Sequence, residues 1–134
     1  MTNTDQNQVI ALIEDEDLIR DLYKRQLEKA GLSVVAFDSG QSALEWFKKH
    51  TADLVLLDVM LPDINGIEIL RQLKADERTK KMRVLLLTNL GQETILKEAE
   101  CLGAEGHFIK VSYTPSQVVE LVQSKLTNGS NITK

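Results

Sequence analysis

The chain has 134 residues, 43% hydrophobic and 27% charged, which are the proportions of one globular domain with its own core. Its net charge of −4 and pI near 5.2 argue against nucleic acid or an anionic membrane as the main partner. Cys101 is the single cysteine, so no internal disulfide can form, and without a signal peptide or a long apolar span a cytoplasmic location is expected.

Short apolar runs alternate along the chain with longer segments of helical period. The runs are expected to form strands at about 9–13, 33–37, 53–57, 83–88 and 106–109. This alternation is typical of βα units and a parallel sheet, and the continuous runs LVLL and VLLL indicate strands covered on both faces. We therefore expect one α/β domain over residues 9–126, between flexible polar ends at 1–8 and 127–134.

The first two helices have recognisable ends. One is expected from about 17 to 30, closed by Gly31, and the next from about 41 to 50, capped by Ser39. The apolar face of the first is expected to carry Ile19, Leu22, Leu27 and Ala30.

The three later helices are marked in the same way. Asn65 and Gly66 lead into the third helix, and Gly103 follows the fourth. Thr114, Pro115 and Gln117 predict a capping box at the start of the fifth, with proline at the first helical position.

Polar side chains stand where four of the strands end. Glu14 and Asp15 follow the first strand, Asp58 closes the third, Thr88 the fourth, and Lys110 follows the fifth. In an open parallel sheet these carboxyl ends are where ligands bind. Alone, Asp58 could be a turn residue, Lys110 a solvated lysine and Thr88 an ordinary strand residue, but the joint pattern favours a common site.

The residue types at these ends suit phosphoryl transfer. Clustered carboxylates repel one another unless a hard cation binds them, and oxygen ligands alone suit Mg²⁺ better than zinc. A carboxylate such as Asp58 can attack phosphorus to give an acyl phosphate when a cation and a lysine offset the charge. Lys110 would supply that charge, and Thr88 a directional hydrogen bond.

The motifs IEDED, LVLLDVMLPDINGIEIL, VLLLTNL and GAEGHFIK, at these intervals, resemble the receiver domain of two-component response regulators. The match covers about 9–126. The resemblance implies a flavodoxin-like (βα)5 fold, with a five-stranded parallel sheet of order 2-1-3-4-5 and helices on both faces.

The resemblance also implies that Asp58 accepts a phosphoryl group from a phosphohistidine of a sensor histidine kinase or a histidine phosphotransfer protein. Glu14, Asp15, Asp58 and the backbone carbonyl of Met60 would hold Mg²⁺ or Mn²⁺. Such a domain is a phosphoacceptor in a phosphorelay rather than an enzyme, although it takes part in its own phosphorylation and slow self-dephosphorylation.

For the switch, the resemblance implies that Thr88 and Lys110 contact the phosphoryl oxygens and that an aromatic position, here His107, responds. This alters the protein-binding face of the fourth helix, fifth strand and fifth helix. The alternative for His107 is an ordinary half-exposed strand histidine.

Several positions depart from the common family pattern. Glu14 replaces an aspartate, and Val111 replaces a proline whose peptide bond is typically cis. Because cis bonds before other residues cost about 2.5–4 kcal/mol, a trans bond is expected here, or a strained cis bond if the site demands it. Asn89 is larger than the small residue usual after the threonine, so access of a phosphodonor to the site is expected to be narrower. Met60 and Leu90 are apolar, whereas residues at these positions in the family help to orient the water that removes the phosphoryl group. Slow loss of the phosphoryl group is therefore predicted.

We expect a stand-alone regulator that binds an unknown downstream protein, without direct contact to nucleic acid or membrane, as a monomer or a weak phosphorylation-dependent dimer. One alternative is a phosphohydrolase of the haloacid dehalogenase type. Such enzymes have a second aspartate two residues after the nucleophile, and in this chain that position is Met60. Another is a receiver-like binding module that acts without phosphorylation. A nucleotide-binding protein is disfavoured, because IEDED replaces a glycine-rich loop after the first strand.

Overall fold

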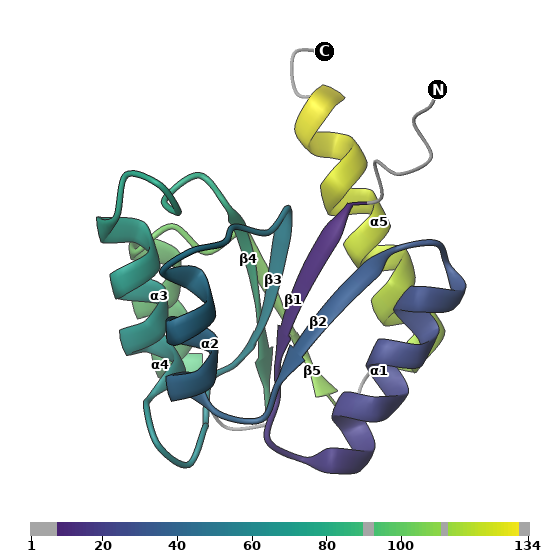
Figure 1. Cartoon of the computed structure of the whole chain (residues 1–134), viewed down its shortest axis with the longest axis horizontal. Coiled ribbons are helices and arrows are strands. Elements are labelled where there is room, and N and C mark those ends of the chain that lie inside the picture. Colours follow the sequence, from purple (N-terminus) through teal and green to yellow (C-terminus); the bar gives the residue numbers. More distant parts are fainter. Residues whose placement is uncertain (1–7, 90–92, 111–112, 132–134) are drawn as a thin grey trace.

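A computed structural model describes residues 8–89, 93–110 and 113–131. Strands and helices alternate throughout these residues (Figure 1). The strands are β1 Val9–Ile13, β2 Ser33–Phe37, β3 Leu54–Asp58, β4 Arg83–Thr88 and β5 Gly106–Ile109. The helices are α1 Asp17–Lys29, α2 Gly40–Phe47, α3 Gly66–Ala75, α4 Glu93–Cys101 and α5 Pro115–Asn131.

All neighbouring strands are parallel, and their order is β2-β1-β3-β4-β5, which confirms the expected topology. The register pairs Ile13 with Leu57, Asp58 with Leu87, and Thr88 with Ile109. The carboxyl ends of these strands therefore lie along one edge of the sheet.

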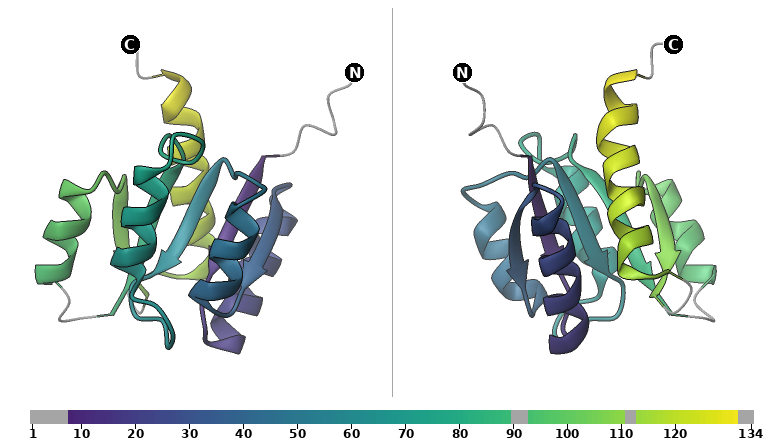
Figure 2. Two further views of the ribbon diagram at one scale, coloured as in Figure 1. Left: turned by 60° about the vertical axis from the view of Figure 1, so that its left-hand side comes forward. Right: turned by 90° about the vertical axis from the view of Figure 1, so that its right-hand side faces the viewer.

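Helices cover both faces of the sheet, with α1 and α5 on one side and α2, α3 and α4 on the other (Figure 2). Successive strand residues point to opposite faces, so each central strand feeds two separate cores. The core beneath α1 and α5 includes Ile10, Leu12, Leu54, Leu56, Leu85, Leu87 and Phe108. The core beneath the other three helices includes Ala11, Ile13, Val55, Leu57, Val84 and Leu86. Continuous apolar runs are needed because both faces are buried.

The expected apolar face of α1 was partly wrong. Tyr23 and Leu27 are its buried residues, whereas Leu22 is 44% exposed and Ala30 is an exposed C-cap residue. Tyr23 and Leu27 are four positions apart and so share one face, while Leu22 is rotated by about 100° from Tyr23. A tyrosine ring that packs edge-on against Phe108 fills the core position expected for leucine.

Helix ends agree with the capping signals in most places. Ser39 Oγ accepts from Ser42 N at 3.2 Å, and Asn65 Oδ1 accepts from Ile67 N at 2.8 Å. The capping box is present in both directions, since Thr114 N donates to Gln117 Oε1 and Gln117 N donates to Thr114 Oγ1.

Two helix ends differ from expectation. Helix α2 ends at Phe47 rather than near 50, because the N–H of Lys48 turns to the carbonyl three residues back. Helix α5 runs to Asn131, into the polar segment 127–134 that was expected to be flexible, since each added residue of a helix gains a backbone hydrogen bond. In the part of the chain described, no helix is both long and apolar enough to cross a bilayer.

Candidate functional site

Four buried polar residues stand at separate strand ends along the carboxyl edge of the sheet, the lower edge in Figure 1. Glu14 follows β1, Asp58 closes β3, Thr88 closes β4 and Lys110 follows β5. Their exposed fractions are 0%, 2%, 1% and 8%, in that order. Charged residues are rarely buried to this extent unless they are paired.

Lys110 joins the two buried carboxylates. Its Nζ lies 2.9 Å from Asp58 Oδ2 and 2.8 Å from Glu14 Oε1. The second oxygen of each carboxylate is held by backbone, because Asp58 Oδ1 accepts from Met60 N at 3.0 Å and Glu14 Oε2 accepts from Glu16 N at 2.9 Å. Both carboxylates are thus fixed in direction before any ligand binds.

The acidic residues fit a hard cation. One carboxylate oxygen from each of Glu14, Asp15 and Asp58 lies within 4.8 Å of the others. Although Glu14 Oε1 is in ionic contact with Lys110, no well-aligned hydrogen bond reaches it from any described residue. A buried oxygen of this kind, in an all-oxygen donor set, suits Mg²⁺ or Mn²⁺. The expected grouping of these three acids is therefore present.

Burial shifts the protonation of the site. Loss of solvation raises the pKa of Glu14 from 4.5 to about 7, despite the opposing contact with Lys110. Loss of solvation likewise raises the pKa of Asp58. For Lys110, burial acts to lower the pKa, but the contacts of its ammonium with the carboxylates of Glu14 and Asp58 outweigh it and raise the pKa. The positive charge of Lys110 does not fully offset the negative charges of the two buried carboxylates, and this favours the binding of a further cation.

The loop after Asp58 is held close to the phosphoacceptor candidate by Gly66. Its N–H donates to Val59 O at 2.8 Å, and a Cβ on Gly66 would lie 2.4 Å from the Asp58 carbonyl oxygen. Asp63, in the same loop, accepts from the N–H groups of Gly40 and Gln41 at 2.9 and 2.8 Å. The loop is therefore tied to the start of α2 as well as to α3.

The remaining sequence candidates lie around this centre. The buried hydroxyl of Thr88 donates to the Phe108 carbonyl at 3.3 Å, so it turns towards the backbone of β5. His107 and Asn89 are exposed, and the Met60 side chain is 55% exposed. Leu90 and Val111, and with them the predicted loss of water orientation and the predicted trans bond between Lys110 and Val111, lie outside the described residues.

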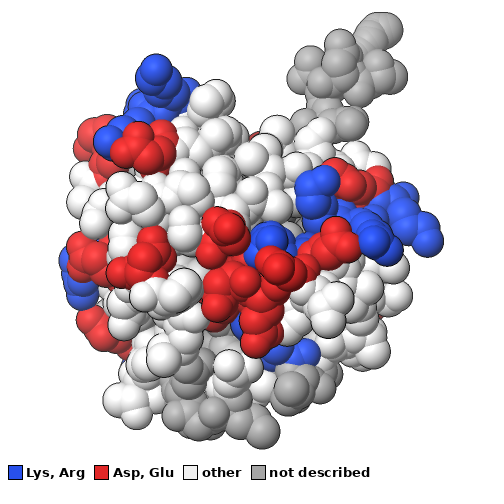
Figure 3. All heavy atoms as spheres, turned by 60° about the horizontal axis from the view of Figure 1, so that its bottom comes forward, with Lys and Arg blue, Asp and Glu red and all other residues white. Residues whose placement is uncertain are grey.

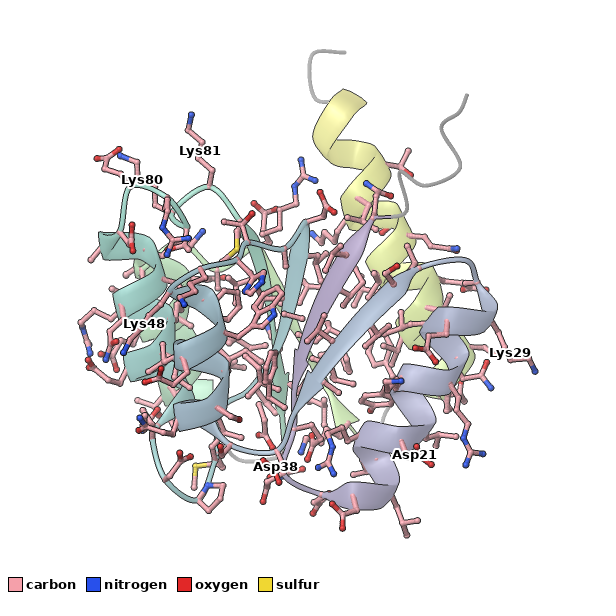
Figure 4. The ribbon with its side chains drawn as sticks, viewed as in Figure 1. Asp21, Lys29, Asp38, Lys48, Lys80 and Lys81 are labelled. Carbon is pink, nitrogen blue, oxygen red and sulfur yellow. The ribbon has the colours of Figure 1, made fainter. Side chains whose placement is uncertain are left out.

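Acidic side chains gather over this edge of the molecule (Figure 3). Asp38, which follows β2, lies at the same edge, while Lys80 and Lys81 lie at the opposite one (Figure 4). Sequence reasoning missed two residues that order the edge, Arg20 and Asp63. The contacts that do so, from Arg20 to the Glu14 carbonyl and from the N–H groups of Gly40 and Gln41 to Asp63, involve backbone groups that leave no signal in the sequence.

Comparison with known proteins gives one consistent family. The family model for the response regulator receiver domain matches residues 10–123. The regulatory protein VanRc of Enterococcus gallinarum is 37% identical over 117 residues, covering 87% of this chain and 49% of VanRc. The transcriptional regulatory protein SrrA of Staphylococcus aureus is 32% identical over 124 residues, covering 92% and 50%. The chain thus spans about half the length of these relatives.

Solved structures show the same architecture. The chemotaxis response regulator CheY4 of Vibrio cholerae aligns with a TM-score of 0.81 at 24% identity, covering 87% of this chain and 97% of CheY4, a likeness of fold alone. The BeF3-activated receiver domain of DrrB, from Thermotoga maritima, aligns with a TM-score of 0.79 at 27% identity, covering 90% and 98%.

Proposed function

The chain belongs to the response regulator receiver domain family of two-component signalling, and from this membership we propose that Asp58 receives a phosphoryl group from a phosphohistidine of a partner protein. The donor is a sensor histidine kinase or a histidine phosphotransfer protein. The observation that carries the proposal is the contact of Lys110 Nζ with Asp58 Oδ2, at 2.9 Å, inside a cluster of three carboxylates.

In the transfer, an Asp58 carboxylate oxygen attacks phosphorus while the bond from phosphorus to the histidine nitrogen breaks. The electron pair stays on the imidazole, and Asp58 becomes a mixed anhydride. Lys110 neutralises charge on the phosphoryl oxygens. The Thr88 hydroxyl leaves the Phe108 carbonyl and donates to one of these oxygens.

Receiver domains bind Mg²⁺ at an acidic pocket, and here Glu14, Asp15, Asp58 and the backbone carbonyl of Met60 would hold Mg²⁺ or Mn²⁺. When bound, the metal offsets the charge of the carboxylates and the phosphoryl group. Asp58 is oriented for attack independently of it, through the hydrogen bond from Met60 N.

The output of this proposal is a changed binding face formed by α4, β5 and α5, with His107 on β5 as the responding ring. It is supported by the hydrogen bond from Thr88 to the Phe108 carbonyl, which couples the site to the backbone beside His107. The target is a downstream protein in the cytoplasm, and the chain acts as a monomer or a weak phosphorylation-dependent dimer. Nucleic acid and membrane are not contacted directly by residues 9–126.

The phosphohydrolase alternative has less support. Such an enzyme needs a second carboxylate two residues after the nucleophile, to protonate the leaving group. That position is Met60, whose side chain is 55% exposed and whose backbone N–H binds Asp58.

The test is intact-mass analysis after incubation with acetyl phosphate and Mg²⁺. The wild type should gain the mass of one phosphoryl group, while Asp58→Asn and a wild-type sample with the metal chelated should not. Equal gain in wild type and Asp58→Asn would contradict the assignment of Asp58, and release of phosphate from small phosphoesters at steady turnover would favour the phosphohydrolase.

A further inference from the structure

Arg20, on the first turns of α1, reaches back across the loop that carries Glu14 and Asp15. Its Nη1 donates to the backbone carbonyl of Glu14 at 2.9 Å, and its Nη2 pairs with Asp17 Oδ1 at 2.7 Å. The Arg20 side chain is 21% exposed, less than that of any other arginine for which an ion pair is found among the described residues. One planar guanidinium thus bridges the end of β1 and the start of α1.

This bridge completes the fixing of Glu14. The backbone N–H of Glu14 donates to Phe37 O at 3.0 Å, and its side-chain oxygens face Glu16 N and Lys110 Nζ. Its carbonyl is held by Arg20, so a directed hydrogen bond holds each backbone polar group of the residue. Asp15 follows in the chain, and the direction of its carboxylate depends on the peptide that Arg20 holds.

The start of α1 has no side-chain cap of its own. Glu16 stands at the N-cap position without a side-chain hydrogen bond to the helix. Four consecutive acids, from Glu14 to Asp17, would push this loop apart in the absence of a nearby cation. The Arg20 guanidinium both closes the loop and offsets part of this repulsion.

We propose that Arg20 is a positioning residue for the metal site, which through the Glu14 carbonyl and Asp17 sets the directions of the Glu14 and Asp15 carboxylates. This inference rests on the proposed Mg²⁺-dependent function. Arg20 does not touch the cation or the phosphoryl group. Its effect is on the affinity of the metal, where partners that orient the ligands typically contribute about 10- to 100-fold.

The test measures Mg²⁺ binding by isothermal titration calorimetry together with the thermal midpoint of the metal-free protein. Arg20→Gln removes both the positive charge and the planar guanidinium, whose two nitrogens bind Glu14 and Asp17 at once. Arg20→Lys keeps only the charge. Arg25→Gln is the matched control, since Arg25 lies on the same helix and pairs with Asp21 at 2.9 Å on the exposed surface. The expected Mg²⁺ dissociation constant rises about 10- to 100-fold in Arg20→Gln, rises by less in Arg20→Lys, and stays unchanged in Arg25→Gln.

Each outcome separates the role of Arg20 from the function on which it rests. If Arg20→Gln lowers the thermal midpoint but, at a temperature where it is folded, binds Mg²⁺ as the wild type does, the residue is structural and the inference fails. Should Arg20→Gln fail to fold, wild-type affinity in Arg20→Lys would overturn it equally. A wild type that binds no Mg²⁺ would instead overturn the metal-dependent function, and the inference with it.

Discussion

Asp58 and Glu14 are buried carboxylates whose ionised forms the folded protein disfavours. Burial raises the pKa of both groups, which means that each is less readily charged in the fold than in the unfolded chain. The burial of these two carboxylates therefore costs stability, which fits a site arranged for the proposed ligands rather than for folding.

Replacing Asp58 by Asn should therefore stabilise the metal-free protein above neutral pH, by about 1 kcal/mol, because it removes a charge that is costly to bury. Chemical denaturation at pH 8 with the metal chelated measures this. Asp38→Asn, at an exposed acid of the same edge, should change the free energy of unfolding little. Marked destabilisation by Asp58→Asn would contradict this prediction, because it would show that the ion pair with Lys110 contributes more free energy than burial of the Asp58 charge costs.

The pKa of Glu14, about 7, predicts a pH dependence. The metal-free fold holds a proton on Glu14 that the unfolded chain releases near pH 4.5, so between these values stability falls as pH rises. Mg²⁺ needs the carboxylate, and its binding at pH 6 should release protons, whereas at pH 9 it should not.

Calorimetry in two buffers of different ionisation enthalpy measures this release. Glu14→Gln should bind Mg²⁺ more weakly and release fewer protons at pH 6. Binding by the wild type at pH 6 without proton release would contradict a protonated Glu14.

Met60 predicts a long-lived phosphoryl group. The side chain is 55% exposed at the rim of the site, and a thioether cannot orient a water for attack as an amide can. Met60→Asn should speed the loss of the phosphoryl group about tenfold, the rate equivalent of one net hydrogen bond. The decay of purified phosphoprotein, followed by intact mass, measures this, with Met60→Leu as control. Equal decay rates in all three proteins would argue against a role for this position.

At the scale of elements, the loop between β3 and α3 depends on Gly66. A methyl group there would overlap the Asp58 carbonyl oxygen and the Val59 Cα, at 2.4 and 2.8 Å, and backbone cannot yield as a side chain can. Gly66→Ala should destabilise the protein by about 1–3 kcal/mol and slow phosphorylation of Asp58, since the loop carries the Met60 N–H that holds it.

Gly106→Ala is the matched control for this prediction. Its Cβ would meet Leu85 Cδ2 at 3.4 Å, an ordinary contact, so the free energy of unfolding should change by less than about 1 kcal/mol. Thermal unfolding and the rate of phosphorylation by acetyl phosphate measure both effects. A Gly66→Ala protein as stable as Gly106→Ala would show that the loop can move away from β3.

The strands and helix starts could be predicted where the local sequence pattern alone determines them. The strands follow apolar runs, and the caps at Ser39, Asn65 and Thr114 follow local chemistry. The face of α1 could not, because Tyr23 and Leu22 are adjacent apolar candidates and packing against Phe108 selects between them. Local propensity does not contain that tertiary choice.

At the scale of the whole molecule, the gathering of the candidate site residues could be predicted because they stand at strand ends, and a parallel sheet brings those ends together. Asp58 and Lys110 meet although they are 52 positions apart in the sequence. The contacts of Arg20 with the Glu14 carbonyl and of Asp63 with Gly40 N–H could not be predicted, since these partners are backbone groups that carry no residue-type signature. The residue types of the candidate site can be recognised in the sequence, whereas the contacts that orient these residues cannot.

The central claim is that separate strand ends form one site for a cation and a phosphoryl group. A crystal structure with Mg²⁺ and beryllofluoride, a phosphoryl mimic, tests it most directly. We predict Mg²⁺ at about 2.1 Å from oxygens of Glu14, Asp15 and Asp58 and the Met60 carbonyl, beryllofluoride on Asp58, and Lys110 Nζ and Thr88 Oγ1 on its fluorines. Beryllofluoride absent from Asp58, or Mg²⁺ bound away from these acids, would contradict the account.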